Sequence, residues 1–220
     1  MMEKQMKLYN GKSSKSIENN IWMIQIPDNP ISLHYKSLAL PTWEKFGYNI
    51  NMFDAVTPDT LDNYNYLEFG RYYDFRDFTD TEKAGFYSHV ELWKKCIEMD
   101  EPITIIEHDV ECLSDEIPIV SDLFSFATFS SDDAWKNYCG HRFSRHPFWG
   151  TENKICPPTH AYYLTPHYAE MLLDIVTSRP QYNFVDDILF IAMGKDETYI
   201  LEHATPIYDH QVGGTMSHEK

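Results

Sequence analysis

The sequence is short of basic residues, and this shortage argues against one class of partner. Its 220 residues include 18 lysines and arginines against 34 aspartates and glutamates, so the formal net charge is −16. Proteins that bind bare nucleic acid through its phosphates rely on Lys and Arg to displace counterions, and this chain is poorly suited to that role. The charge does not exclude an anionic small ligand, which a local pocket or a bound metal can hold.

Long apolar runs and paired cysteine motifs are also missing. No segment approaches the roughly 18 uninterrupted apolar residues of a membrane span, and the charged start of the chain lacks the apolar core of a signal peptide. We therefore expect a cytoplasmic protein without a membrane span, in the cytosol of a bacterium or of a phage-infected host. The cysteines show no C-x-x-C spacing and are expected to be reduced thiols: Cys96, Cys112, Cys139 and Cys156.

A glycine-rich dinucleotide fingerprint, internal repeats and linker-like tracts are absent as well. The lack of a G-x-G-x-x-G after the first apolar run disfavours an oxidoreductase or a methyltransferase. Hydrophobic residues make up 43% of the chain and aromatic residues 15%, which is enough for a folded core. We expect one domain over residues 19–211, with flexible ends at 1–18 and 212–220.

Apolar periodicity predicts an α/β fold. Residues 21–26 and 48–53 are short strand-like runs. The helix between them is expected to begin at Asn29-Pro30 and to be broken or kinked at Pro41. A strand, a helix and a second strand of these lengths are typical of a mainly parallel central sheet flanked by helices.

The rest of the chain continues this pattern. Residues 59–78 have no clear period and are expected to be an irregular surface segment. Thr79 and Glu82 form a capping box, which predicts a helix that ends near Asp100, before a buried strand over 103–106. The remaining predicted elements are a helix from Thr165-Pro166, a helix around 187–193 and a last strand over 198–201.

Acidic residues follow the apolar strand over 103–106 directly. Ligands bind at the carboxyl ends of strands in open α/β sheets, and Glu107-His108-Asp109 would place carboxylates there on a rigid support. Such groups suit a hard divalent cation that neutralises a diphosphate. The alternative is a solvated strand end with a helix cap, and the spacing alone does not decide between the two.

Several segments, in the same order along the chain, resemble glycosyltransferase family 25, which covers lipooligosaccharide-type and collagen-modifying sugar transferases. Residues 81–93 (TEKAGFYSHVELW) resemble its helix with "G-E-I-x-x-x-x-S-H", and 103–110 (ITIIEHDV) its strand ending in "L-E-D-D". The resemblance covers roughly residues 20–217. Further similar segments are 53–56 (FDAV), 159–173 (THAYYLTPHYAEMLL), 185–187 (VDD) and 206–211 (PIYDHQ) with Ser217.

The sequence also departs from the family pattern in three places. His108 stands within the acidic run, and Lys83 and Ala84 stand where a Glu and an apolar residue are typical. The basic residue that commonly follows the first strand is absent from residues 28–30. These differences affect the expected donor sugar and metal more than the expected reaction.

The resemblance implies a single GT-A-like (Rossmann-like) domain that transfers a sugar from a nucleotide donor, UDP-linked, with Mn²⁺ or Mg²⁺ as cofactor. It implies a metal site at Asp109, with His210 as a second ligand, and an inverting reaction with Asp187 or Asp186 as catalytic base. For Asp186 and Asp187 the alternative is a simple helix cap, and for His210 a surface histidine. The donor-binding residues implied are Glu107, Ile26, Asp54, Ser88, His89 and Lys83.

The acceptor is expected to bind to residues 124–160, a long stretch with little periodicity in which aromatic rings alternate with cations. The acceptor is expected to be a saccharide such as lipopolysaccharide, or else a hydroxymethylated pyrimidine of phage DNA or its sugar. A third alternative is a transferase fold that has lost catalysis and binds sugars or a protein. The sequence does not determine the oligomeric state. The acceptor-binding residues expected are His160, Arg142, Arg145 and Trp149.

Overall fold

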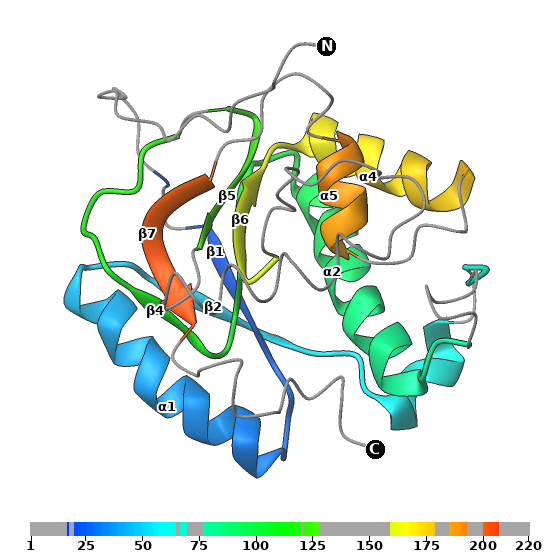
Figure 1. Cartoon of the computed structure of the whole chain (residues 1–220), viewed down its shortest axis with the longest axis horizontal. Coiled ribbons are helices and arrows are strands. Elements are labelled where there is room, and N and C mark those ends of the chain that lie inside the picture. The colour runs from blue at the N-terminus through cyan, green and yellow to red at the C-terminus, as the bar shows by residue number, and fades with distance from the viewer. Residues whose placement is uncertain are drawn as a thin grey trace, which may run out of the picture.

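A seven-stranded mixed sheet with helices on both faces forms the centre of the computed structural model (Figure 1). The strand order is β2-β1-β3-β6-β5-β7-β4. The strands are β1 (Ile21–Gln25), β2 (Ile50–Asp54), β3 (Ile103–Glu107), β4 (Val110–Cys112), β5 (Leu123–Ala127), β6 (Ala161–Leu164) and β7 (Ile200–Pro206). The structure describes residues 17, 20–64, 67–69, 77–119, 121–127, 159–178, 185–192 and 200–206.

The β2-β1-β3 part of the sheet is parallel, as expected for a chain in which helices connect the strands. Helix α1 (Pro30–Lys45) joins β1 to β2, and helix α2 (Asp80–Met99), preceded by the 3₁₀ helix η1 (Pro58–Tyr64), leads into β3. β5 and β7 are also parallel, whereas β3–β6, β5–β6 and β4–β7 are antiparallel. The predicted α/β class, with one central sheet flanked by helices, is confirmed.

The helices divide into two layers, one on each face of the sheet (Figure 1). Helix α2 packs with α4 (Pro166–Ser178) and α5 (Val185–Ala192) over a face that buries Trp93, Ile105 and Tyr162. Helix α1 covers the opposite face, where Trp43 and Met23 are fully buried. Side chains alternate between faces along a strand, so every second residue of β3 and β6 faces α2.

Two local predictions are confirmed at the ends of helices. Asn29 caps α1, because its side chain accepts hydrogen bonds from the backbone N–H groups of Ile31 and Ser32. Thr79 and Glu82 form the predicted capping box of α2: the Glu82 carboxylate accepts from the Thr79 N–H at 2.8 Å, and the Thr79 hydroxyl accepts from the Glu82 N–H.

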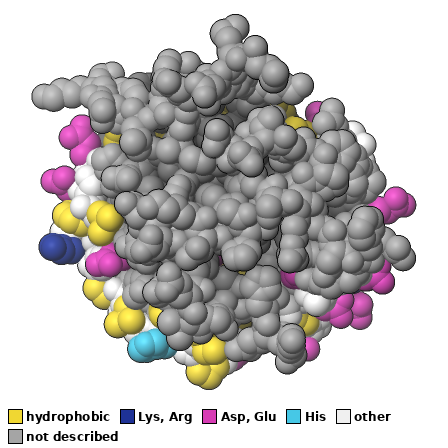
Figure 2. Space-filling model, in the orientation of Figure 1, with side chains coloured by type: hydrophobic (Ala, Val, Ile, Leu, Met, Phe, Trp, Pro, Cys, Tyr) yellow, Lys and Arg dark blue, Asp and Glu magenta, His cyan; other side chains and the backbone are white. Residues whose placement is uncertain are grey.

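Of the two outcomes predicted at Pro41, a break or a kink, the break is wrong, because α1 continues through Pro41 to Lys45. Proline removes one helical N–H, but the last turn is held by Trp43, which is fully buried and donates its indole N–H to the carbonyl of Val110 at 2.7 Å. The buried residues of α1 are Ser32, Ala39 and Trp43, whereas Ile31 and Leu38 are exposed. Figure 2 shows hydrophobic side chains gathered at its lower left, over α1.

Strand positions in the second half of the chain also differ from the predictions. β5 begins at Leu123, so the start of the segment expected to be irregular over 124–160 is a strand of the sheet. β7 covers 200–206 and so continues past the predicted end at residue 201, while residues 198 and 199 lie outside the described residues. None of the described helices has the length and apolar character needed to cross a bilayer.

Candidate functional site

The parallel strands end together at one edge of the sheet. Gln25 at the end of β1 is in register with Asp54 at the end of β2, and Ile24 with Glu107 at the end of β3. In the sheet β1 lies between β2 and β3. The chain moves outward from β1 to β2 and then back past β1 to β3, so the strand order reverses beside β1. Such a reversal is where ligands bind in α/β sheets, and it places Glu107 at the expected position.

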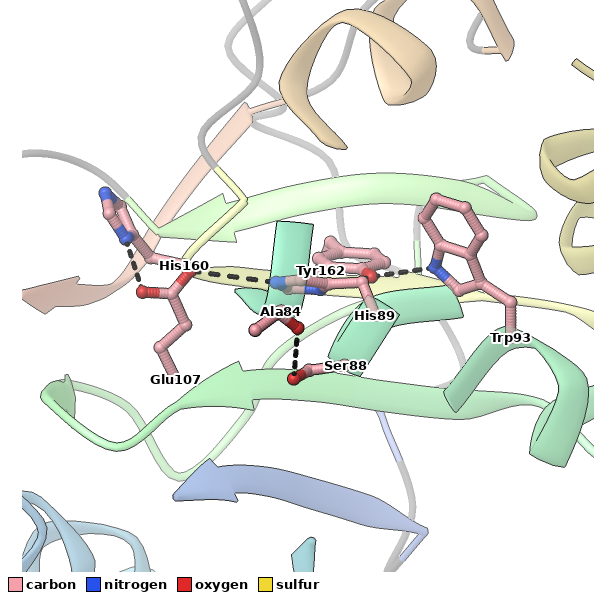
Figure 3. A network of polar contacts seen from close by, with 7 residues as sticks. All are labelled: Ala84, Ser88, His89, Trp93, Glu107, His160 and Tyr162. Carbon is pink, nitrogen blue, oxygen red and sulfur yellow. Dashed lines mark hydrogen bonds and ion pairs between the residues drawn. The ribbon is translucent and has the colours of Figure 1, made fainter. Parts of the chain in front are cut away.

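Glu107 is held by the neighbouring antiparallel strand. Ile106 pairs with Ala161, and the next residue along, Glu107, donates its backbone N–H to the carbonyl of His160 at 2.8 Å. The side chains of Glu107 and His160 therefore share one face of the sheet, and His160 Nδ1 lies 3.3 Å from Glu107 Oε2 (Figure 3). His160, expected from the sequence to bind the acceptor, contacts the predicted donor-binding carboxylate, and its contact with an acceptor stays a prediction.

The charges of this pair are mutually stabilised. Burial alone would lower the pKa of His160, but the charge of Glu107, the hydrogen bond to it, and the charges of Asp109 and Asp186 together raise that pKa to about 9. Burial alone would raise the pKa of Glu107, but His160 and, more weakly, His89 hold it well below its usual range. His160 is therefore an imidazolium and Glu107 a carboxylate at neutral pH.

Asp109 has the most unusual environment of the described acids. It is 2% exposed, and its Oδ1 atom is buried without a hydrogen-bond partner among the described residues. Burial raises the pKa of Asp109, and the negative charge of Glu107 raises it further. A buried carboxylate oxygen without a donor is costly for the folded protein unless a cation or a proton satisfies it.

The donor set at this edge fits a divalent cation in part. Asp109 Oδ1 provides a carboxylate oxygen, the type of ligand that Mg²⁺ and Mn²⁺ prefer, and Mg²⁺ is commonly bound by one or two carboxylates together with substrate phosphates. Within the described ranges no group of three or more His, Cys, Asp or Glu side chains is arranged to hold a metal by itself. A cation here would therefore need phosphate or water oxygens in addition to the protein ligands.

Helix α2 brings two further predicted residues to the site. His89 faces the sheet, with its Nε2 3.9 Å from Glu107 Oε1 and its Nδ1 2.9 Å from the hydroxyl of Tyr162 (Figure 3). Ser88 is 1% exposed, donates to the carbonyl of Ala84 and accepts from the backbone N–H of Val56. In this structure the hydrogen bonds of Ser88 therefore connect α2 to the loop that follows β2.

The other predicted donor-binding residues lie at the same edge or at the start of α2. Asp54 accepts a hydrogen bond from Gln25 at 2.7 Å. Ile26 follows β1 directly, and its N–H is bonded to Ser32 Oγ. Lys83 lies in the first turn of α2 and pairs with Asp80 at 3.0 Å. Direct contact of these residues with a donor stays a prediction.

The predicted catalytic and acceptor residues are described only in part. Asp186 is buried in the first turn of α5, and its influence on the pKa of His160 places it in the same electrostatic cluster. Asp187 lies in the same turn, but its side chain is not among those described. His210, Arg142, Arg145 and Trp149 lie outside the described residues.

The sequence analysis missed two aromatic residues that complete the site. Tyr162 on β6 and Trp93 on α2 are fully buried, and the Trp93 indole donates to the Tyr162 hydroxyl at 2.9 Å. Their spacing was a usable signal: Trp93 is four residues after His89 on a helix, and Tyr162 is two residues after His160 on a strand. Each pair therefore shares one face of its element.

With this geometry established, comparison with known proteins shows a family to which part of the chain is similar. The family model that matches the chain is that of glycosyltransferase family 25, and its description reads "LPS biosynthesis protein". The match covers residues 35–139. The resemblance to glycosyltransferase family 25 is confirmed. The match contains α2 and the Glu107–Asp109 segment but not the similar segments after residue 139, whose assignment stays a prediction. The match supports sugar transfer as the general activity.

Two further comparisons add less. No curated protein matches the chain significantly. A similar solved structure is described as the crystal structure of a glycosyltransferase involved in the glycosylation of the major capsid of PBCV-1. It is 10% identical, with a TM-score of 0.45, over 85% of this chain and 92% of that chain. A likeness this distant adds nothing to the family 25 match.

Proposed function

We propose that this family 25-like chain is a metal-dependent, inverting glycosyltransferase with a GT-A-like site. It transfers a sugar from a UDP-linked donor to a hydroxyl group of a saccharide such as lipopolysaccharide. The observation that carries the proposal is the buried Oδ1 of Asp109 near the point where the strand order reverses, since this atom has no hydrogen-bond partner within the described part of the chain. Support for sugar transfer comes from the family match, whose description names LPS biosynthesis.

Each acidic residue has a distinct part in this proposal. Asp109 would hold a divalent cation, which supplies charge stabilisation for the departing nucleoside diphosphate. Glu107, kept ionised by His160, would accept hydrogen bonds from ribose or sugar hydroxyl groups of the donor. Asp187 or Asp186, at the start of α5, would take the proton from the acceptor hydroxyl.

The metal assignment is tested by replacing one carboxylate oxygen. We expect the protein to release nucleoside diphosphate from at least one nucleotide sugar when Mn²⁺ or Mg²⁺ is present. Asp109→Asn should lower this rate on the order of 100-fold or more, because charge stabilisation of the leaving group is lost. Glu111→Gln is the matched control, since Glu111 lies two residues further on in β4 and has no part in the proposed site.

The outcomes separate the alternatives. If Asp109→Asn retains the wild-type rate, the metal assignment is wrong. If no donor is consumed and none raises the melting temperature in the presence of metal, the transferase proposal is replaced by a binding module. Comparing lipopolysaccharide with hydroxymethylated DNA as acceptors in the same assay decides which acceptor class is used.

A further inference from the structure

A chain of buried polar contacts runs from the core to Glu107. The Trp93 indole N–H donates to the Tyr162 hydroxyl oxygen at 2.9 Å, and that hydroxyl lies 2.9 Å from His89 Nδ1. On the far side of the ring, His89 Nε2 faces Glu107 Oε1 at 3.9 Å. Figure 3 shows these side chains in line, with His89 between Tyr162 and Glu107.

The donors and acceptors in this chain permit one arrangement of protons. An indole nitrogen can only donate, so the Tyr162 hydroxyl oxygen accepts from Trp93, and the Tyr162 O–H still needs an acceptor. Tyr162 is fully buried, and among the described residues His89 Nδ1 is the only acceptor that its hydroxyl contacts. If Nδ1 carried a proton, the Tyr162 O–H would be buried without an acceptor, which is strongly unfavourable.

We infer that His89 is held as the neutral Nε2–H tautomer by Tyr162 and Trp93, so that its N–H points at Glu107 Oε1. Together with His160 at Oε2, this places a nitrogen donor beside each oxygen of the carboxylate. Trp93, Tyr162 and His89 are then positioning residues, which orient Glu107 and do not touch the donor. Burial lowers the pKa of His89, which agrees with a neutral ring.

The functional consequence rests on the proposed role of Glu107 in donor binding. A carboxylate bonded to His160 at Oε2 and faced by the His89 N–H at 3.9 Å from Oε1 is restricted in orientation, so hydroxyl groups of the donor meet an acceptor that needs little reorganisation. Loss of the positioning residues should therefore weaken donor binding more than it slows the chemical step.

The tautomer can be measured on the wild-type protein without any activity. In a ¹H–¹⁵N spectrum of protein labelled with ¹⁵N-histidine, we expect His89 to show a protonated Nε2 and an unprotonated Nδ1. The resonances are assigned to His89 by their loss in His89→Gln. A protonated Nδ1, alone or together with Nε2, would overturn the inference.

The positioning role is measured by kinetics with matched variants. Tyr162→Phe removes the hydroxyl and should raise the donor KM roughly tenfold with little change in kcat, because a ground-state binding contact is misplaced. Tyr163→Phe is the matched control on the same strand, since Tyr163 packs on the opposite face of the sheet. An unchanged donor KM in Tyr162→Phe would overturn the positioning role.

A second pair of variants tests which ring nitrogen matters. His89→Gln keeps an amide donor near the Nε2 position, so its donor KM should stay closer to wild type than that of His89→Asn, whose amide falls near Nδ1. Equal effects of the two variants would contradict the Nε2–H assignment. If the wild-type protein transfers no sugar, the proposed function fails, while the spectrum still decides the tautomer.

Discussion

At the scale of single residues, the site depends on buried polar side chains whose partners come from distant parts of the chain. Ser88 is an example: its hydroxyl accepts the N–H of Val56, 32 residues away, and donates to Ala84 in its own helix. This bond fixes the loop that leaves the carboxyl end of β2, close to Asp54. Ser88 therefore shapes the edge of the site whether or not it touches a ligand.

Removing the Ser88 hydroxyl should destabilise the protein. Ser88→Ala leaves the buried N–H of Val56 without its partner, so we expect the free energy of unfolding to fall by about 1–3 kcal/mol. Urea denaturation followed by circular dichroism measures the change. Ser37→Ala, which removes an exposed hydroxyl bonded within α1, should change it by less than about 0.5 kcal/mol. Equal effects of the two variants would contradict a stabilising role for the hydrogen bond between Ser88 and Val56.

At the scale of elements, α2 organises the site because one of its faces carries both polar and apolar contacts with the sheet. His89 and Trp93, four residues apart, reach Glu107 and Tyr162, while Val90 and Cys96 pack into the core. The capping box determines where this helix begins. The start of α2 is therefore specified by local sequence, and its orientation by packing.

The contribution of the cap can be isolated from the packing. Thr79→Ala removes the acceptor for the Glu82 N–H and should lower the free energy of unfolding by ~1 kcal/mol. Thr81→Ala is the control, since Thr81 is exposed in the first turn and is not the cap. Denaturation curves of the two variants, compared in urea, give the difference. A Thr79→Ala curve that overlays the control would show that the capping box adds no stability.

At the scale of the whole molecule, the sheet separates the candidate site from the α1 layer. The Glu107 side chain faces α2, whereas Trp43 on α1 packs into the core on the other face and donates to the carbonyl of Val110. Val110 begins β4, at the edge of the sheet. The Trp43 contact therefore connects the α1 layer to the end of the sheet farthest from β2.

This separation predicts a loss of stability without a change at the site. Trp43→Phe leaves a buried carbonyl unpaired and a small cavity, so the free energy of unfolding should fall by about 2–4 kcal/mol. Trp22→Phe should cost about 1 kcal/mol, since Trp22 is only half-buried and its indole bonds to nearby Asn20. Donor affinity, measured by calorimetry below the unfolding temperature, should be unchanged in both. A weaker affinity in Trp43→Phe would show that the layers are coupled.

Much of the fold follows from local sequence, and the exceptions have physical causes. The strands near 21, 50 and 103 were predictable from short apolar runs, and the start of α2 from its capping box. The end of α1 was not predictable from local sequence, because a tertiary contact of Trp43 stabilises the helical turn that follows Pro41. β5 and β6 were missed, since short strands in an aromatic-rich region carry little periodic signal.

The sequence by itself determined that acidic residues end a buried strand, because composition and strand length are local properties. It also indicated the family through residues 81–93 and 103–110. Only the tertiary structure decided that His160 pairs with Glu107 and that Tyr162 and Trp93 orient His89. The reason is that these contacts depend on the antiparallel register of β3 with β6 and on the packing of α2 over that face, which no local pattern encodes.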